Sequence, residues 1–292
     1  MNNLREIDIV LKPTNSHWVG DGFKVSQYLP SQYFDMTRFS PFLLLDYNEP
    51  YYFEPGNTPL GVGAHPHRGF ETVTLAYEGS VEHHDNKGNH GIINKGDAQW
   101  MTAADGIMHK EYHSHEFTKT GGWLHMVQLW VDLPKEFKRT TPKYQPITAD
   151  QFATIKLDDD AGEIKVLAGE VKGVKGPAST FSPMNVYNVY LNENKAVNLL
   201  EPTNYNTQVM VIKGSVTING ELINNGELVA FKHNSEQIEI TANEDETIVL
   251  VLSGKPLEQP IFAYGPFVMT NEQEIREAFE DFESGKFGPF EF

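Results

Sequence analysis

The run TVTLAYEGSV at residues 72–81 has the pattern of an apolar strand that ends in a Gly-Ser turn. The run VMVIKGSV at residues 209–216 repeats this pattern in the second half of the chain. Each copy is followed by a glycine and an acidic residue that lead into another apolar strand, at Gly96-Asp97 and at Gly226-Glu227. Two features that recur in the same order indicate an internal repeat. We therefore predict two copies of one β-structure.

Strand-like runs continue on both sides of these two stretches. They are separated mostly by Gly, Asn or Pro, which is the pattern of a β-sandwich or a β-barrel. The runs cover residues 72–77, 126–131, 186–191, 209–213, 228–231, 237–241 and 247–252. We predict an all-β fold of two tandem jelly-roll barrels, the first in residues 1–138 and the second in residues 139–292. The join is expected between Leu133 and Pro146, where three prolines cluster among charged residues.

One segment near the C-terminus has the pattern of a helix. Thr270 can cap its first turn, with Gln273 three residues later, and Gly285 can end it. The residues between these ends include an apolar stripe at helical spacing, made of Ile275, Ala278, Phe279 and Phe282. We expect this short helix to pack its stripe on a barrel rather than on a partner protein.

The composition narrows the chemistry that the chain can perform. Its 292 residues include no cysteine, which excludes disulfides, thiolate catalysis, iron–sulfur clusters and cysteine-ligated zinc. Any metal must therefore be held by imidazole and carboxylate, and the chain has 11 histidines. The net charge of −17 disfavours direct binding of nucleic acid, because an acidic surface repels phosphate backbones.

The sequence shows no signal for secretion or for a membrane. Residues 1–10 include acidic side chains and lack the apolar core of a secretory signal. No apolar run approaches the length that a membrane span requires. We expect a soluble, cytoplasmic protein with no membrane partner.

Two pairs of candidate metal ligands lie in the first copy of the repeat. His65 and His67 occur in the run GAHPHRGFE at residues 63–71, and His109 and Glu111 in the run DGIMHKE at residues 105–111. Side chains two residues apart on a strand point to the same face, so each pair can ligate one ion. Facing strands would combine three imidazoles and one carboxylate and leave open positions on a six-coordinate ion. We predict one divalent metal ion at these four residues.

Two further histidines compete with this set. His113 and His115 continue the alternation of His109 and Glu111, and on spacing alone His113 could be a ligand. We expect both to lie at the rim of the pocket, where they could attract loosely bound metal.

Three other residues near the motifs have less clear positions. The adjacent His83 and His84 cannot face the same way on a strand, so we expect them at the pocket rim or in solvent. Glu71 offers a second carboxylate in the first motif. Two carboxylates with three imidazoles would crowd one ion.

The second copy of the repeat lacks the residues for such a site. Counted from its own glycines, the positions of the four ligands fall on Leu200, Pro202, Glu239 and Thr241. His233 is the one histidine in this copy. We expect the second barrel to bind no metal and to have a structural or partner-facing role.

The chain resembles the pirins, a family with two cupin barrels, along nearly all of its length. The resemblance is carried by the runs HPHRGFETV at residues 65–73, GDAQWMTA at residues 96–103 and GIMHKE at residues 106–111. Further matching runs are PFLLLD at residues 41–46, QLWVDLP at residues 128–134 and GPFVM at residues 265–269. The resemblance implies a double-stranded β-helix, the cupin fold, for each barrel.

The resemblance also implies which ligands and which metal the site uses. Pirins bind iron in the N-terminal barrel through three histidines and one glutamate, which fall here on His65, His67, His109 and Glu111. The family uses the later glutamate, so Glu71 is not expected to bind the ion. Fe(II) is favoured on this resemblance alone, because such ligands also accept Ni, Cu, Mn, Co or Zn.

Two functions are implied by the same resemblance. Some pirins are linked to flavonol cleavage, in which dioxygen opens quercetin between its 2 and 3 positions. On this hypothesis the metal acts as a Lewis acid, and Glu111 is both a ligand and a possible base for the 3-hydroxyl proton. Other pirins are regulators without enzymatic activity that bind a transcription factor or a metabolic enzyme. A cupin isomerase or a sugar-binding protein is a third hypothesis, which the pirin motifs disfavour.

Overall fold

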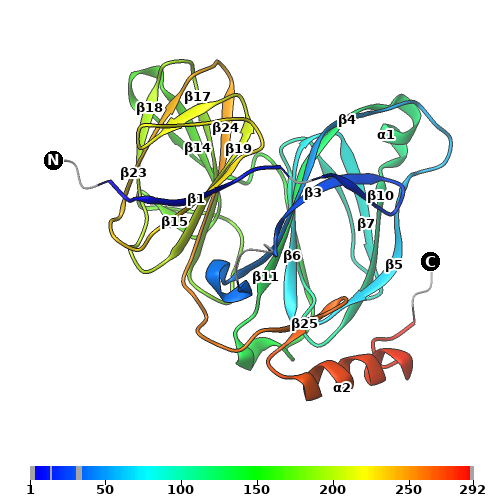
Figure 1. Ribbon diagram of the computed structural model, residues 1–292. Coiled ribbons are helices and arrows are strands. Elements are labelled where there is room, and N and C mark those ends of the chain that lie inside the picture. The colour runs from blue at the N-terminus through cyan, green and yellow to red at the C-terminus, as the bar shows by residue number, and fades with distance from the viewer. Residues whose placement is uncertain (1–3, 14, 31–34, 290–292) are drawn as a thin grey trace. The chain divides into compact units, whose positions relative to one another are not determined.

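The computed structural model describes residues 4–13, 15–30 and 35–289, and the chain divides into two compact units. The first barrel consists of Thr14–Thr37, Pro41–Ala149 and Leu257–Phe292. The second barrel consists of Met1–Pro13, Arg38–Ser40 and Asp150–Pro256. Figure 1 shows the red C-terminal helix with the cyan strands of the first barrel and the blue N-terminal strand with the yellow strands of the second.

The first barrel is built from two antiparallel sheets. Its strands are β2 (His17–Val19), β3 (Phe23–Leu29), β4 (Phe42–Phe53), β5 (Gly61–His67), β6 (Phe70–Glu78), β7 (Ser80–Asp85), β8 (His90–Asn94), β9 (Ala98–Thr102), β10 (Ile107–His113), β11 (Gly122–Asp132) and β12 (Lys143–Ile147). The larger sheet has the order β12-β9-β6-β11-β4-β3-β2, and the smaller has the order β5-β10-β7-β8.

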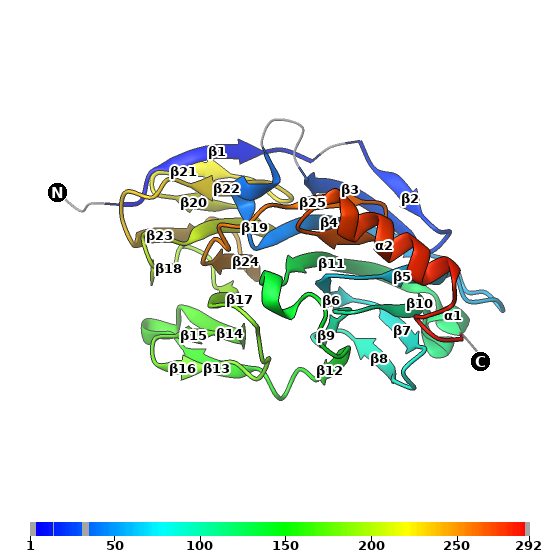
Figure 2. The same ribbon diagram turned by 90° about the horizontal axis from the view of Figure 1, so that it is seen from below.

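The second barrel repeats this construction. Its strands are β1 (Ile7–Leu11), β13 (Ala153–Lys156), β14 (Gly162–Ala168), β17 (Met184–Leu191), β18 (Ala196–Leu200), β19 (Asn206–Lys213), β20 (Val216–Ile218), β21 (Glu221–Ile223), β22 (Leu228–Phe231), β23 (Gln237–Ala242) and β24 (Thr247–Gly254), with a small hairpin of β15 (Glu170–Val171) and β16 (Val174–Lys175). Its sheets have the orders β1-β22-β19-β24-β17-β14-β13 and β18-β23-β20-β21, as Figure 2 displays.

The two barrels therefore have the same sheet topology. The strand β6 corresponds to β19, and the pair β5 and β10 corresponds to β18 and β23. The two runs that carry the repeat in the sequence, at residues 72–81 and 209–216, begin on these equivalent central strands. The prediction of an all-β chain with two jelly-roll barrels is confirmed.

The boundaries of the two units differ from the predicted domains 1–138 and 139–292. The strand β1 belongs to the second barrel, because it pairs with β22. The strand β12 belongs to the first barrel, because it pairs with β9. The proline-containing stretch 133–146, in which the join was predicted, is therefore part of the first barrel.

The C-terminal segment completes the first barrel with a hairpin and a helix. It contains β25 (Phe262–Tyr264), β26 (Phe267–Met269) and α2 (Glu272–Glu283), which Figure 1 shows beside one another. A side chain at Gly69 would place its Cβ 1.9 Å from the carbonyl oxygen of Val268, so only glycine allows β26 to pass this close to the barrel. Residues 139–292 are thus not one domain, because their last part closes the first barrel.

The N-cap of α2 lies one residue later than predicted. Asn271, not Thr270, is the N-cap, and its side-chain oxygen accepts a hydrogen bond from the amide of Glu274. Thr270 instead donates its hydroxyl and its amide to the Glu274 carboxylate. The predicted apolar stripe packs as expected, in a cluster that contains Met108, Phe267, Met269, Ile275, Ala278, Phe279, Phe282 and Phe287.

The other short helix, α1 (His115–Thr120), follows β10 in the first barrel and is capped by Ser114. No helix in the described parts of the chain is long and apolar enough to cross a membrane.

Candidate metal centre

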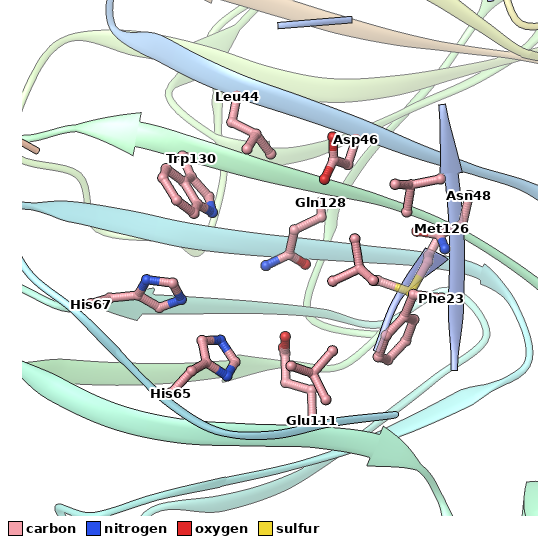
Figure 3. Close-up of a pocket in the computed structure, with 13 residues that line it drawn as sticks. Phe23, Leu44, Asp46, Asn48, His65, His67, Glu111, Met126, Gln128 and Trp130 are labelled. Carbon is pink, nitrogen blue, oxygen red and sulfur yellow. The ribbon is translucent and has the colours of Figure 1, made fainter. Parts of the chain in front are cut away.

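The strands β5 and β10 bring the two predicted ligand pairs together inside the first barrel. They pair antiparallel, and His109 lies directly opposite His65. A β-bulge follows His109, and Glu111 then lies opposite Val62. Along β10 the buried residues alternate with half-buried ones, so His109 and Glu111 both point inward. Figure 3 shows His65, His67 and Glu111 facing the same pocket.

The three imidazoles lie close enough to share one ion. Their ring centroids are 4.3 Å apart for His65 and His109, 4.8 Å for His65 and His67, and 4.9 Å for His67 and His109. One nitrogen from each ring lies within 4.8 Å of the others. Such a cluster of three rings can surround a single metal ion.

The hydrogen bonds of these rings leave nitrogens that suit a metal. The Nδ1 of His65 is 2.8 Å from the carbonyl oxygen of Gly63, so it carries the proton and Nε2 is the nitrogen that can ligate. The Nδ1 of His67 and the Nε2 of His109 are buried without any hydrogen-bond partner. A buried polar atom without a partner is costly, and a metal ion would satisfy both nitrogens.

The burial of His67 and His109 also determines their protonation state. Burial lowers the pKa of His67 and of His109 well below 6.5, and the neighbouring His65 lowers both further. These two rings are therefore neutral near pH 7, which is the form that binds a metal. The residues present fit a divalent ion in both position and charge.

Glu111 is held by a chain of amide and hydroxyl groups. The side-chain amide of Gln99, on β9, donates to Glu111 Oε1 at 2.6 Å and also contacts the Thr74 hydroxyl at 2.9 Å. Thr74 donates in turn to Gln128 at 2.7 Å. This chain fixes one carboxylate oxygen of Glu111 and leaves the other for an ion or a proton. Gln99 is not among the residues predicted for the site.

His83 lies in a different place from the one predicted for it. It is fully buried, not at the rim, because on β7 it alternates inward with Val81 and Asp85. Its Nδ1 is 3.3 Å from His109 Nδ1, and its Nε2 is 3.5 Å from a carboxylate oxygen of Asp85. Its ligand atoms also lie within 4.8 Å of those of His109 and Glu111. The period-two pattern of SVEHHD at residues 80–85 was the signal that could have placed it.

The other competing histidines have different positions. His113 does point inward, but its Nε2 is 2.9 Å from the carbonyl oxygen of Gly22, and Phe23, Phe53 and Phe117 surround its ring. The prediction that it lies at the rim is wrong, because it is buried in an apolar cluster. His115 is exposed at the start of α1.

Glu71 is buried apart from the imidazole cluster. Its Oε1 accepts a hydrogen bond from the Thr102 hydroxyl at 2.7 Å, and its Oε2 has no partner. Burial raises the pKa of this carboxyl to about 7. Glu71 does not line the pocket and is in none of the ligand groups that the described residues form.

The imidazoles open onto a pocket with a mostly apolar wall. The cavity has a volume of about 210 Å³, compared with ~30 Å³ for a water molecule in the liquid. Its lining comes from both sheets, and Figure 3 labels most of the residues. The lining residues are Val19, Phe23, Val25, Leu44, Asp46, Asn48, Val62, His65, His67, Glu111, Met126, Gln128 and Trp130.

A second carboxyl lines this pocket away from the imidazoles. Asp46 projects from β4, and its Oδ1 is buried without a hydrogen-bond partner. Burial raises its pKa to about 7, against a hydrogen bond to the Gln27 side chain that lowers it. Near neutral pH this carboxyl can therefore either donate or accept a hydrogen bond.

The equivalent strands of the second barrel carry aliphatic side chains instead. On β18 the buried residues are Val197 and Leu199, and on β23 they are Ile238, Ile240 and Ala242. These side chains belong to one hydrophobic core. The interior positions that hold the candidate ligands in the first barrel thus contain core residues in the second.

Comparisons with known proteins agree with this architecture. Residues 22–131 match the Pirin family, and residues 186–288 match the Pirin C-terminal cupin domain. The crystal structure of quercetin 2,3-dioxygenase from Acinetobacter baumannii has a TM-score of 0.93 and 45% identity and covers 98% of this chain and 99% of that one.

Two relatives from other organisms are similar over almost their whole length. The Pseudomonas aeruginosa protein named "Putative quercetin 2,3-dioxygenase PA2418" is 46% identical over 273 residues, which cover 94% of this chain and 95% of that protein. Pirin-like protein At1g50590 of Arabidopsis thaliana is 30% identical over 290 residues, which cover 96% and 90% respectively. Because pirin family models match both barrels and these relatives extend across both, the chain belongs to the pirin family.

Proposed function

We propose that this protein is a metal-dependent dioxygenase that opens a flavonol such as quercetin with dioxygen. The observation that carries the proposal is that His65, His67 and His109 form one group of potential ligands. Glu111 lies within reach of His109 and lines the same apolar pocket as His65 and His67. Relatives at 45% and 46% identity bear the name quercetin 2,3-dioxygenase, which supports the same substrate class.

The proposed ligands are His65, His67, His109 and Glu111, and they would hold one divalent ion. When bound, the ion supplies a Lewis acid that favours the deprotonated form of an oxygen on the substrate. Fe(II) is our preferred metal, and Ni, Cu, Mn, Co and Zn are alternatives that suit the same ligand types.

The apolar wall gives the flat rings of a flavonol a suitable surface. Phe23, Met126 and Trp130 line the pocket, and aromatic and thioether side chains pack well on aromatic rings. Gln128 and Asp46 supply polar groups among them, which can orient the hydroxyls of the substrate. A pocket of this kind excludes water from the reacting part of the molecule.

Glu111 is the proposed base for the 3-hydroxyl proton of the substrate. The hydrogen bond from Gln99 holds one of its oxygens, so the carboxylate presents the other in a fixed direction. The proton removed from the substrate would reside on that second oxygen, while Oε1 would ligate the ion with the lone pair that does not accept from Gln99. Gln99 acts here as a positioning residue, because it contacts Glu111 and does not line the pocket.

Oxygen consumption with a panel of flavonols tests the proposal. Metal-free protein would be loaded separately with Fe(II), Ni(II), Mn(II), Co(II), Cu(II) and Zn(II), and metal content would be measured before each assay. We expect flavonol-dependent oxygen uptake with at least one metal, and its loss in a His65→Ala, His67→Ala variant. Uptake that persists in this variant would contradict the assigned site.

The absence of turnover with every metal and several flavonols would overturn the enzymatic proposal. The remaining hypothesis would then be a metal-sensing regulatory protein, in which the ion sets the charge and shape of a surface that a partner binds. The same loaded samples serve both hypotheses, because metal binding itself is measured independently of turnover.

A further inference from the structure

A second group of potential ligands lies on the opposite face of β7 from His83. Glu82 and His84 flank His83 on this strand and point outward, since side chains alternate along a strand. His90 lies on the neighbouring strand β8, directly paired with His84. We call Glu82, His84 and His90 the outer cluster. None of these residues lines the pocket of the metal centre.

The three side chains of the outer cluster converge on one point. The two imidazole rings stack with centroids 4.3 Å apart and an interplanar angle of 19°. The Nε2 of His84 is 3.1 Å from Glu82 Oε1, and the Nε2 of His90 is 2.9 Å from the same oxygen. One ligand atom from each residue lies within 4.8 Å of the other two.

These separations match the spacing of ligands around a small divalent ion. With bonds of about 2.0–2.2 Å to nitrogen and oxygen, neighbouring ligands of a tetrahedral or octahedral ion lie roughly 2.9–3.5 Å apart. The two measured nitrogen–oxygen distances fall at the lower end of this range. Hydrogen bonds between the same atoms keep the three side chains assembled in the metal-free protein. For an ion to bind, each Nε2 must give up the proton that it donates to Glu82, either to solvent or to the Nδ1 of the same ring.

The surroundings set the kind of ion and the strength of binding. Two imidazoles and one carboxylate suit borderline divalent ions such as Zn(II), Ni(II) or Cu(II). The side chains are between 25% and 51% exposed, so water can complete the coordination. Lys110 on β10 pairs directly with His84, and its positive charge opposes a cation nearby.

We propose that the outer cluster is a second binding site for a borderline divalent ion, separate from the centre at His65, His67, His109 and Glu111. The site binds more weakly than the interior one, because it has three protein ligands instead of four and is open to water. An ion bound here links β7 to β8 and adds positive charge to the outer face of the smaller sheet.

Titration with Ni(II) followed by calorimetry tests this proposal. Adding His109→Ala to the His65→Ala, His67→Ala variant removes the residue that both interior groups share and leaves the outer cluster intact, so binding at the outer cluster can be measured alone. We expect this variant to bind about one equivalent of Ni(II). Adding His84→Ala to the same background should weaken that binding by ~10-fold or more, on the scale of a lost metal contact.

Two further variants separate a metal site from a merely hydrogen-bonded cluster. Lys110→Gln should tighten Ni(II) binding at the outer cluster, because a repelling charge is removed. A cluster that is only hydrogen-bonded would bind no Ni(II), with or without Lys110. His115→Ala is the matched control, since it removes an exposed histidine elsewhere on the first barrel and should change nothing. Circular dichroism would verify that each variant is folded.

The proposal is overturned if the interior-site variant binds no Ni(II) up to millimolar concentration, or if its binding survives His84→Ala with His90→Ala. Because all these measurements use binding without a flavonol, they are independent of whether the protein is a dioxygenase.

Discussion

Glu111 and Glu71 are both buried carboxyls of the first barrel, and their hydrogen-bond partners give them different roles. Glu111 accepts a hydrogen bond from an amide and faces the pocket, so its free oxygen is accessible to a ligand. Glu71 accepts one from a hydroxyl and has no partner for its second oxygen. The raised pKa of Glu71 indicates that burial favours its neutral form.

Replacing Glu111 with glutamine separates its two proposed roles. An amide oxygen can still coordinate a metal weakly, but an amide has no basic site near neutral pH. We expect Glu111→Gln at measured full metal occupancy to keep flavonol binding and to lose turnover by ~10²-fold or more. Substantial turnover by the fully loaded variant would remove Glu111 from the role of base.

Replacing Glu71 with glutamine should change stability in a way that depends on pH. The pKa of Glu71 is about 7 in the folded state against 4.5 for a free side chain, so the folded state binds the proton more tightly. Proton binding by Glu71 therefore adds to the free energy of unfolding. The addition is complete below about pH 4.5 and is lost as the pH rises through 7. The metal-free Glu71→Gln variant should gain up to about 3 kcal/mol relative to wild type between pH 5 and pH 8.

Urea unfolding of both metal-free proteins at the two pH values measures this difference. The same variant should bind metal as wild type does, because Glu71 is apart from the imidazoles. A large loss of metal affinity in Glu71→Gln would show instead that this carboxylate is a ligand.

His83 is expected to orient His109 without binding the ion. Its ring stacks on Tyr144 at 4.8 Å with an interplanar angle of 8°, so His83→Phe keeps the shape and removes the nitrogen that faces His109. We expect metal affinity to fall by about 10–100-fold, which is typical when the partner of a metal-binding histidine is lost.

The control for this variant is His125→Phe. His125 is also a buried imidazole of the first barrel, with a hydrogen bond to the Tyr47 hydroxyl, but it is remote from the ligand groups. Metal affinity should be unchanged in this control. A loss far above 100-fold in His83→Phe would identify His83 as a direct ligand, in the group that it forms with His109 and Glu111.

At the scale of single elements, strand patterns in the sequence were a reliable guide. All seven predicted strand runs lie within β6, β11, β17, β19, β22, β23 and β24. The spacing of His65 with His67 and of His109 with Glu111 correctly predicted which side chains would face inward together, because period two is a property of any strand. Such patterns depend only on local geometry.

Features that depend on distant contacts were harder to predict. Gln99 and Asp46 are ordinary polar residues in sequence, and only the folded barrel shows that one bonds to Glu111 and the other lines the pocket. His113 has the spacing of a ligand, yet the phenylalanines around it come from β3, β4 and α1. The sequence does not tell at which depth of a barrel an inward side chain lies.

The strand β5 gives the most direct test of the metal centre. The His65→Ala, His67→Ala variant should lose the tightly bound ion and remain folded, because the apolar core clusters of the first barrel keep all their members. Metal content after dialysis, together with circular dichroism, checks both parts. One tightly bound equivalent in this variant would show that the ion is held elsewhere.

At the scale of the whole molecule, the two units were correctly predicted in number but not in extent. The composition of residues 133–146 suggested a linker, because prolines and charges gather there. In the structure Lys138 from this stretch is 2% exposed and donates hydrogen bonds to Asp132 and to the carbonyl oxygens of Gly69 and Val268. Long-range contacts of this kind leave no periodic signal in a sequence.

A substitution of a buried residue within 257–289 should therefore weaken the barrel that contains the candidate metal centre. Phe267 is fully buried among Met108, Ile275, Ala278 and Phe287. We expect Phe267→Ala to lower the free energy of unfolding by about 3–5 kcal/mol. The four tryptophans, at positions 18, 100, 123 and 130, all lie in the first barrel, so their fluorescence reports its unfolding.

Phe231→Ala is the matched control, because Phe231 is equally buried in the core of the second barrel. It should alter the fluorescence transition less than Phe267→Ala does. An unchanged fluorescence transition in Phe267→Ala would mean that the C-terminal segment does not support the first barrel.

Arg68 has partners in the C-terminal segment, which the ribosome makes last. Its guanidinium is 3% exposed, donates to Asp281 at 2.9 Å and lies 4.6 Å from the ring of Phe287. A ribosome that adds about 5–20 residues per second needs roughly 5–20 s to pass through residues 150–256 before these partners emerge. During that interval the guanidinium of Arg68 has Asp105 but lacks Asp281, and an apolar surface of the nascent first barrel lacks its cover. We expect this stage of translation to be the one at which chaperones bind the chain.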